Sequence, residues 1–314
     1  MPNFQLQPFK HQSAFRRIAA VAWDEPRDPT IYGSTEVIAD RLLEWIDLKR
    51  RETGEKVTVT HAVAMALAVA LRKHPDCNAV VRWGRLQLRR DIDVFLQVAV
   101  PADGEGGQAD LTGYCVRQAD KKDIAGLAKE VREAAGRLRR SEDPDFQRTK
   151  GQAATIPGLI FGKILRLLKF LQVGLNIDTG FLGAPKDPFG SAMVTSLGMF
   201  GVRVAYAPFF PLASAPIIIL VGSCEDKPVA IDGAVVVRKV LHLNATLDHR
   251  VVDGYHAAML NQEIKMLLEN PRRLEFEGER DHMMGASDNT TDLETLDVDP
   301  ATEDAAEGAS KGDA

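Results

Sequence analysis

A chain of 314 residues, 45% of them hydrophobic, is long enough for one large domain or two small ones around a sizeable core. The net charge of −5 is uneven: residues 279–314 hold eleven acidic and two basic residues, so residues 1–278 carry +4. The small positive charge of residues 1–278 suits an anionic cofactor, but it is too weak to indicate nucleic-acid binding. We therefore expect no nucleic-acid partner. The acidic end lacks aromatic residues, which predicts a disordered tail at 279–314.

The cysteines indicate a cytoplasmic protein without a metal site. Cys77, Cys115 and Cys224 are widely spaced and form no C-x-x-C pair, so neither a zinc cage nor a redox pair is expected. Free thiols are typical of a reducing compartment. Residues 1–10 also lack the apolar run of a signal peptide.

The first elements alternate between helices and strands. The sequence predicts a short helix at 14–22, a strand at 30–38 and an amphipathic helix at 41–51. A further helix is predicted at 61–73, with Thr60 as its cap. Its many small apolar residues favour close packing on a sheet, and we expect His61, at its start, to lie in a cap or at the surface.

A group of strands follows, predicted at 79–83, 86–88, 93–100 and 111–116. The polar, Gly-rich stretch 101–110 lacks both phosphate-binding glycine motifs, so we interpret it as a connection. Asp123 is predicted to cap a helix at 124–138, whose many charged residues favour a solvent-facing position.

Residues 142–189 hold several prolines around a basic apolar segment, 159–173. Its cations, Lys163, Arg166 and Lys169, recur every third residue, and each would cost ~2.5–3.5 kcal/mol at the centre of a bilayer, so a spanning helix is excluded. Two interpretations stay open. The favoured one is a helix packed between subunits or over the mouth of a site. The other is a basic amphipathic helix on an anionic membrane surface.

The last third of the chain predicts strands at 191–197, 216–222 and 235–247, with a hairpin turn at 232–233. The last strand leads through a loop into a helix at 257–268.

The loop carries the spacing H-x-x-x-D-G in His249, Asp253 and Gly254. A neutral imidazole can take a proton from a thiol or hydroxyl at neutral pH, and the carboxylate can cap the helix or hold the loop. The alternative is a structural histidine at a strand end.

Three segments in order resemble one family. These are Ala119 to Ile124, Val194-Thr195-Ser196-Leu197-Gly198-Met199-Phe200-Gly201, and Lys227 to Gly254 with the histidine motif. They resemble the catalytic domain of the 2-oxo acid dehydrogenase dihydrolipoyl acyltransferases, which are relatives of chloramphenicol acetyltransferase. The resemblance covers about residues 10 to 275, interrupted at 142–189. It implies an α/β fold of the chloramphenicol acetyltransferase type: a two-layer sandwich of a mixed sheet with helices on one face. The catalytic domain would span 1–278.

The resemblance also implies the chemistry. His249 would be the general base that deprotonates the thiol of coenzyme A or of dihydrolipoamide, while Asp253 would pair with an arginine to hold the loop. Aligning the family segment T-I-S-N-L-G puts Thr195 at the oxyanion-stabilising hydroxyl, where the family usually has serine. The expected cofactor-binding residues are Arg16, Arg17 and Ser196, although Arg16 or Arg17 could instead pair with Asp253 or lie in solvent.

Family active sites lie between the subunits of a trimer, which implies a homotrimer here. Because the chain ends in an acidic tail, we expect an isolated trimer. The sequence shows no lipoyl or subunit-binding domain, so the lipoyl group would sit on a separate partner protein, or the acceptor would differ. Two rival functions stay open: a small-molecule O- or N-acetyltransferase, and a non-catalytic assembly or membrane-associated scaffold.

Overall fold

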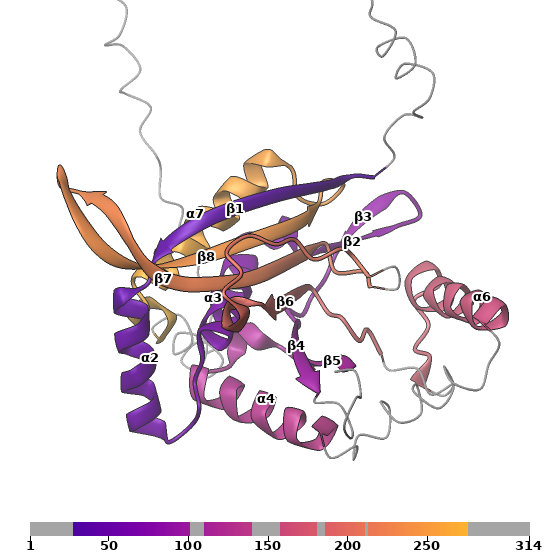
Figure 1. Cartoon of the computed structure of the whole chain (residues 1–314). Coiled ribbons are helices and arrows are strands. Elements are labelled where there is room, and N and C mark those ends of the chain that lie inside the picture. The colour runs from indigo at the N-terminus through magenta and orange to yellow at the C-terminus, as the bar shows by residue number, and fades with distance from the viewer. Residues whose placement is uncertain (1–27, 101–109, 140–157, 181–185, 211–212, 276–314) are drawn as a thin grey trace, which may run out of the picture.

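The computed structural model describes residues 28–100, 110–139, 158–180, 186–210 and 213–275 (Figure 1). The predicted helix at 14–22 and the predicted acidic tail lie outside these ranges. The polar stretch 101–110 also lies outside them, apart from its last residue.

A six-stranded mixed sheet forms the frame of the domain (Figure 1). In spatial order its strands are β1 (Thr30–Ile38), β8 (Ala234–Asp248), β7 (Ile217–Ile231), β6 (Ala192–Ser196), β4 (Val94–Val100) and β5 (Asp110–Val116). Strand β6 pairs in parallel with β4 and β7, whereas the other pairs are antiparallel. A separate hairpin consists of β2 (Ala79–Arg82) and β3 (Arg85–Leu88).

The main helices cover one face of this sheet. They are α2 (Asp40–Thr53), α3 (Val59–Lys73), α4 (Ile124–Arg139) and α7 (Gly254–Glu269). Helix α3 is buried on all sides between residues 61 and 71, because its small residues let it pack closely against both α7 and the sheet. Alternate strand residues such as Val194, Ile219 and Leu243 join these helices in one core.

The opposite face of the central strands is covered by the irregular segment that follows β6. The Asn244 side chain donates to the carbonyl of Arg203 at 2.9 Å, and the Ser223 N–H donates to the carbonyl of Val202 at 2.8 Å. A mixed sheet with its helices on one face is the predicted two-layer α/β sandwich, and that prediction is confirmed.

The predicted turn at 232–233 is present, and a two-residue turn also joins β2 to β3, where Trp83 was predicted to be the last residue of a strand. Trp83 and Gly84 have φ of 51° and 71°, and Asp232 and Gly233 have φ of 51° and 80°. Positive φ at both central residues is the turn that matches the twist of a hairpin. The turn at Asp232 and Gly233 joins β7 to β8, whose far halves extend beyond the rest of the sheet (Figure 1).

Two local predictions are wrong. The cap of α3 is Thr58 rather than Thr60, because the Thr58 hydroxyl accepts from the N–H of His61 while the His61 ring accepts from the N–H of Thr58. Helix α4 is not simply solvent-facing. Its apolar side, including Leu127 and Val131, is buried in the core, and only its other side carries the exposed charges.

The histidine in this capping box gives a pH prediction for stability. Burial lowers the pKa of His61 to about 4, from 6.5. The unfolded chain therefore binds more protons, and the free energy of unfolding should fall as the pH drops from about 6.5 to about 4, by up to ~3 kcal/mol. Denaturant unfolding of the wild type and His61→Gln across this range measures the effect. Glutamine keeps the capping box but does not titrate, so an equal fall in both proteins would contradict the assignment.

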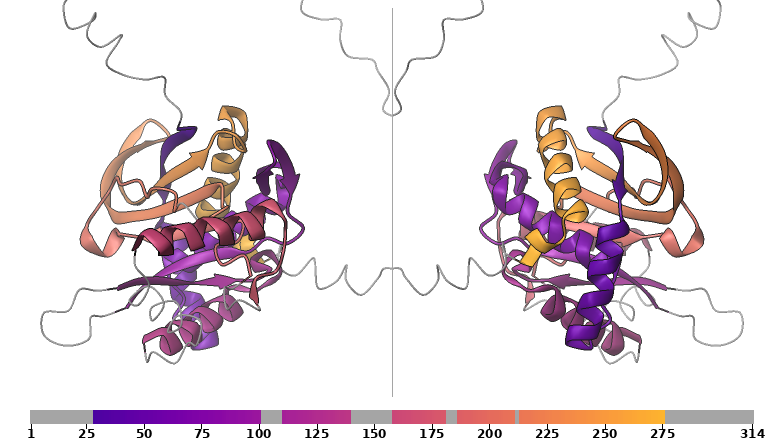
Figure 2. Two further views of the ribbon diagram at one scale, coloured as in Figure 1. Left: turned by 90° about the vertical axis from the view of Figure 1, so that its right-hand side faces the viewer. Right: turned by 90° about the vertical axis from the view of Figure 1, so that its left-hand side faces the viewer.

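The inserted segment contains a helix that lies apart from the main helical layer. Helix α6 (Gly158–Lys169) continues into a π-helical turn (Phe170–Gly174), beside the β2–β3 hairpin. Figure 2 shows α6 lying lengthwise across one side of the molecule. None of the helices in the described ranges combines the length and apolar character needed to cross a bilayer.

Candidate active site

The loop that carries His249 is held by backbone contacts on both sides. The N–H of His249 donates to the carbonyl of Pro29, just before β1, at 2.8 Å. The N–H groups of Val251 and Val252 both donate to the carbonyl of Asp248 at 2.9 Å. Strand β8 therefore turns sharply at Asp248, and the histidine is presented at the end of the sheet.

An ion pair closes the same turn. The Arg250 guanidinium donates to the two Asp248 carboxylate oxygens, with Nε to Oδ1 at 2.9 Å and Nη2 to Oδ2 at 2.6 Å. Burial alone would raise the pKa of Asp248, but hydrogen bonds from the side chain and backbone of Arg250 outweigh it and lower that pKa. Arg250 therefore stabilises the turn that presents His249. The aspartate that it binds was not identified from the sequence, although the D-x-R spacing was visible.

Asp253 caps α7 as predicted. Its carboxylate accepts from the N–H of His256 at 2.9 Å and lies 2.8 Å from Nδ1 of the His256 ring. The backbone N–H of His256, helped by the ring, lowers the pKa of Asp253. The arginine partner expected for Asp253 is not among the described residues, and Arg16 and Arg17 lie outside the described ranges.

The His249 side chain is exposed. With Asp28, Pro29, Thr30 and other residues it lines a shallow, open depression of about 380 Å³. No described residue forms a hydrogen bond with its imidazole ring. The described ranges also contain no cluster of three or more His, Cys, Asp or Glu side chains that could hold a metal ion.

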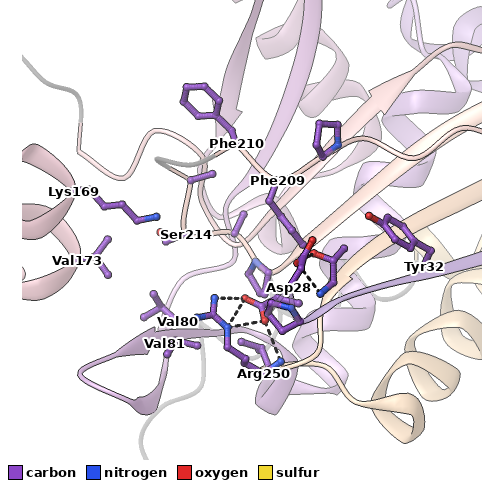
Figure 3. Close-up of a pocket in the computed structure, with 18 residues that line it drawn as sticks. Asp28, Tyr32, Val80, Val81, Lys169, Val173, Phe209, Phe210, Ser214 and Arg250 are labelled. Carbon is purple, nitrogen blue, oxygen red and sulfur yellow. Dashed lines mark hydrogen bonds and ion pairs between the residues drawn. The ribbon is translucent and has the colours of Figure 1, made fainter. Parts of the chain in front are cut away.

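A deeper cavity of about 450 Å³ lies directly beside this depression (Figure 3). The two share Asp28, Pro29, Thr30 and Arg250. Valine, proline and phenylalanine side chains form much of the cavity wall, including Val80, Val81, Pro208, Phe209 and Phe210. Its volume is within the range of small-molecule sites.

The inserted segment forms one wall of this cavity. Lys169 and Val173 face it from α6 and the π-helical turn, on the side opposite Tyr32 (Figure 3). Burial, and after it the charge of Arg250, lowers the pKa of Lys169. Sequence reasoning placed this helix over a site mouth or between subunits, but did not identify the two lining residues, because only the fold brings residue 173 near residue 250.

Thr195 and Ser196 lie near the end of β6 and point to opposite faces. Thr195 is in register with Leu220, and Ser196 with Val221, which belongs to the helical core. The strand then leads to Gly198, where an added Cβ would lie 2.3 Å from the carbonyl oxygen of Gly222. Only glycine permits this close approach of two backbones, which explains why the segment needs glycine at this position.

One copy of the chain does not bring Thr195 and His249 together. Thr195 pairs with Leu220 on β7, and Leu220 pairs with Asn244 on β8. His249 lies five residues beyond Asn244, which is ~16 Å along the strand direction at ~3.3 Å per residue. Strand β8 is also two strand spacings from β6, which is ~10 Å across the sheet. The two backbones are thus roughly 19 Å apart.

Comparison with known proteins gives a family match. The family model for the catalytic domain of 2-oxoacid dehydrogenase acyltransferases matches residues 16–156 and 187–276. The break in this match, residues 157–186, lies within the predicted interruption at 142–189 and contains α6.

Similar sequences carry related names. The dihydrolipoyllysine-residue acetyltransferase component of the pyruvate dehydrogenase complex of Zymomonas mobilis is 26% identical over 82% of this chain and 49% of that protein. The lipoamide acyltransferase component of the branched-chain alpha-keto acid dehydrogenase complex of Pseudomonas putida is 26% identical over 83% and 49%. The chain spans about half the length of these relatives.

Similar folds occur in solved structures. A probable dihydrolipoamide acetyltransferase from Listeria monocytogenes aligns with a TM-score of 0.57 and 22% identity, over 85% of this chain and 95% of that one. The cubic core of a pyruvate dehydrogenase multienzyme complex aligns with a TM-score of 0.58 and 21% identity, over 79% and 84%. These likenesses agree with the predicted fold.

Proposed function

The chain belongs to the family of 2-oxoacid dehydrogenase acyltransferase catalytic domains, and we propose that it moves an acyl group between coenzyme A and a dihydrolipoyl thiol. The observation that carries the proposal is the exposed imidazole of His249 on a rigid turn beside a cavity of small-molecule size. The names of the relatives, which are acetyl- and acyltransferase components acting with lipoyl groups, support the same reaction.

In this mechanism His249 takes the proton from the acceptor thiol, and the sulfur attacks the carbonyl carbon of the thioester. The carbonyl oxygen becomes an oxyanion, to which the Thr195 hydroxyl donates a hydrogen bond. The intermediate then collapses: the bond from carbon to the first sulfur breaks, and the imidazolium returns its proton to the departing thiolate. Threonine keeps the hydroxyl donor of the family serine but adds a methyl group that restricts its rotation.

The separation of Thr195 and His249 supports a shared site. A proton acceptor and an oxyanion donor must both lie within about 3 Å of the reacting groups, whereas one chain holds them roughly 19 Å apart. We therefore propose a homotrimer in which a neighbouring copy supplies the hydroxyl. One of the structural neighbours is a cubic core, whereas we propose an isolated trimer for this chain.

The lipoyl partner, the coenzyme A contacts and the location of the protein are also proposals. The lipoyl group would come from a separate lipoyl-domain protein, and Arg16, Arg17 and Ser196 would contact coenzyme A. A cytoplasmic location and a disordered acidic tail at 279–314 also stay predictions. The alternative interpretation of residues 159–173, contact with a membrane surface, concerns the exposed side of α6 and not the reaction.

The cavity beside His249 is the proposed place for the acyl group or the thiol arm of a substrate. Its wall combines apolar side chains with the charged groups of Lys169, Asp248 and Arg250, which suits an aliphatic arm that carries a polar end. Because Lys169 and Val173 come from the segment that interrupts the family match, this wall is a feature of this chain and not of the family model.

An acceptor assay tests the proposal. The full chain, supplied with acetyl-coenzyme A and dihydrolipoamide, is expected to release coenzyme A and form S-acetyldihydrolipoamide at a rate that saturates with both substrates. A small-molecule acetyltransferase would instead prefer an alcohol or amine over the dithiol in direct competition. A chain that neither binds coenzyme A nor releases it with any acceptor would favour the scaffold alternative and contradict the proposal.

A further inference from the structure

Two segments far apart in the sequence meet and form one surface. The β2–β3 hairpin lies within residues 79–90, and α6 with its continuation lies within 158–177. Together these segments contain seven lysine and arginine residues and no aspartate or glutamate, although the whole chain has a net charge of −5. Arg89 pairs with Asp187 and Lys169 faces the cavity, so the exposed cations of these segments are Arg85, Arg90, Lys163 and Arg166. The exposed aspartates Asp91 and Asp178 follow directly at the ends of the two segments.

Direct contacts hold the two segments together. The indole N–H of Trp83 donates to the carbonyl of Gly174 at 2.7 Å, and the Nε–H of Arg82 donates to the same carbonyl at 2.9 Å. The Trp83 and Phe170 rings meet edge to face, with their centroids 5.8 Å apart. The hairpin tip and α6 thus form a continuous unit.

Large apolar side chains remain exposed across this unit. Trp83 is 65% exposed, Leu86 54% and Leu167 57%. Leu88, Ile164 and Phe170 are exposed as well. The exposed cations Lys163, Arg166, Arg85 and Arg90 lie on the same two segments. Large exposed apolar side chains on two segments that contact each other indicate a site of contact with a partner.

The exposed side of α6 carries both apolar and cationic side chains. Lys169 faces the cavity, on the inner side of the helix. At ~100° per residue, Leu167 lies roughly 160° around the helix from Lys169, and Ile164 roughly 140°. Both therefore point away from the cavity. Leu165 and Leu168, roughly 40° and 100° from Lys169, are half-buried on the inner side. The exposed positions are Lys163, Ile164, Arg166 and Leu167, so the outward side of α6 carries cations together with apolar side chains.

We propose that this surface, formed by α6 and the β2–β3 hairpin, docks on an anionic lipid bilayer. The exposed leucines and Trp83 would enter the boundary between headgroups and acyl chains, where tryptophan is favoured, and the cations would meet lipid phosphates. The positive charge of the exposed side chains favours an anionic bilayer as the partner. A second copy in a twofold contact would place like charges opposite each other, whereas an anionic bilayer complements the exposed cations. A trimer neighbour would meet this surface with a different patch, and light scattering distinguishes that outcome.

Vesicle co-sedimentation of the full chain tests the proposal. Binding is expected to vesicles of mixed phosphatidylglycerol and phosphatidylcholine and to be weak for phosphatidylcholine alone. Lys163→Gln with Arg166→Gln should weaken binding roughly 25-fold, at about fivefold per cation. Leu86→Ser with Leu167→Ser should weaken it about tenfold or more. Acyl transfer should be unchanged in all variants, because none of these residues lines the cavity or the His249 depression.

Matched controls lie on the far side of the domain. Arg51→Gln with Lys56→Gln removes two exposed charges from outside the surface, and Leu48→Ser removes one exposed leucine from α2; both should bind as the wild type does. Failure to bind anionic vesicles, or equal binding by all variants, would overturn the proposal. So would a fall in molecular mass by light scattering in the leucine variant, because that result would assign the surface to a second copy of the chain.

Discussion

Replacement of His249 by alanine is expected to lower the rate of acyl transfer by about 10²–10⁴, the contribution of a well-placed general base. Without the imidazole, the acceptor thiol must lose its proton to water before it attacks. The substrates should still bind, so the loss should fall on kcat more than on KM. Steady-state kinetics with acetyl-coenzyme A and dihydrolipoamide measure both quantities.

The structure predicts that this variant folds. The His249 ring is exposed and forms no hydrogen bond with any described residue, while its backbone bond to Pro29 does not depend on the side chain. His256→Ala is the matched control, because it removes the other imidazole near the loop and keeps the backbone N–H that Asp253 accepts. Equal activity in the wild type and His249→Ala would move the base elsewhere and contradict the assignment.

Much of the fold could be predicted because its signals are local. The 30–38 strand is found with the predicted bounds, and its residues alternate between exposed and more buried positions from Ile31 to Val37. The turn at Asp232 and Gly233 and the cap at Asp253 were also readable, because each depends on a side chain or a backbone conformation within a few residues. Local chemistry of this kind needs no knowledge of the tertiary fold.

The wrong predictions arise where the sequence offers two alternatives and does not decide between them. Thr58 and Thr60 are both good cap residues, and the choice depends on His61, whose ring completes the capping box only with Thr58. Helix α4 carries many charges, but the sheet buries its apolar side. Lys169 and Val173 could not be assigned to a cavity, because that assignment requires the contact of the inserted segment with the hairpin.

The pairing of His249 with Thr195 came from resemblance, and one chain does not bring them together. If the site is shared, Thr195→Val should lower the rate of transfer by about 10²–10³, because valine keeps the branched shape but cannot donate to the oxyanion. Thr195→Ser should retain activity, since it keeps the hydroxyl. Ser196→Ala is the control on the opposite face of β6, and its loss should be smaller. An active Thr195→Val enzyme would exclude this hydroxyl as the oxyanion donor.

Mixing the two inactive variants separates a shared site from a site within one chain. In a trimer assembled at random from equal amounts of His249→Ala and Thr195→Val chains, roughly one site in four would join an intact histidine from one copy to an intact threonine from its neighbour. Co-refolding should therefore restore about a quarter of the wild-type activity. A site built within one chain would recover none, because every chain in the mixture lacks one of the two groups. The recovered activity thus tests the distance of roughly 19 Å between the two residues as well as the trimer.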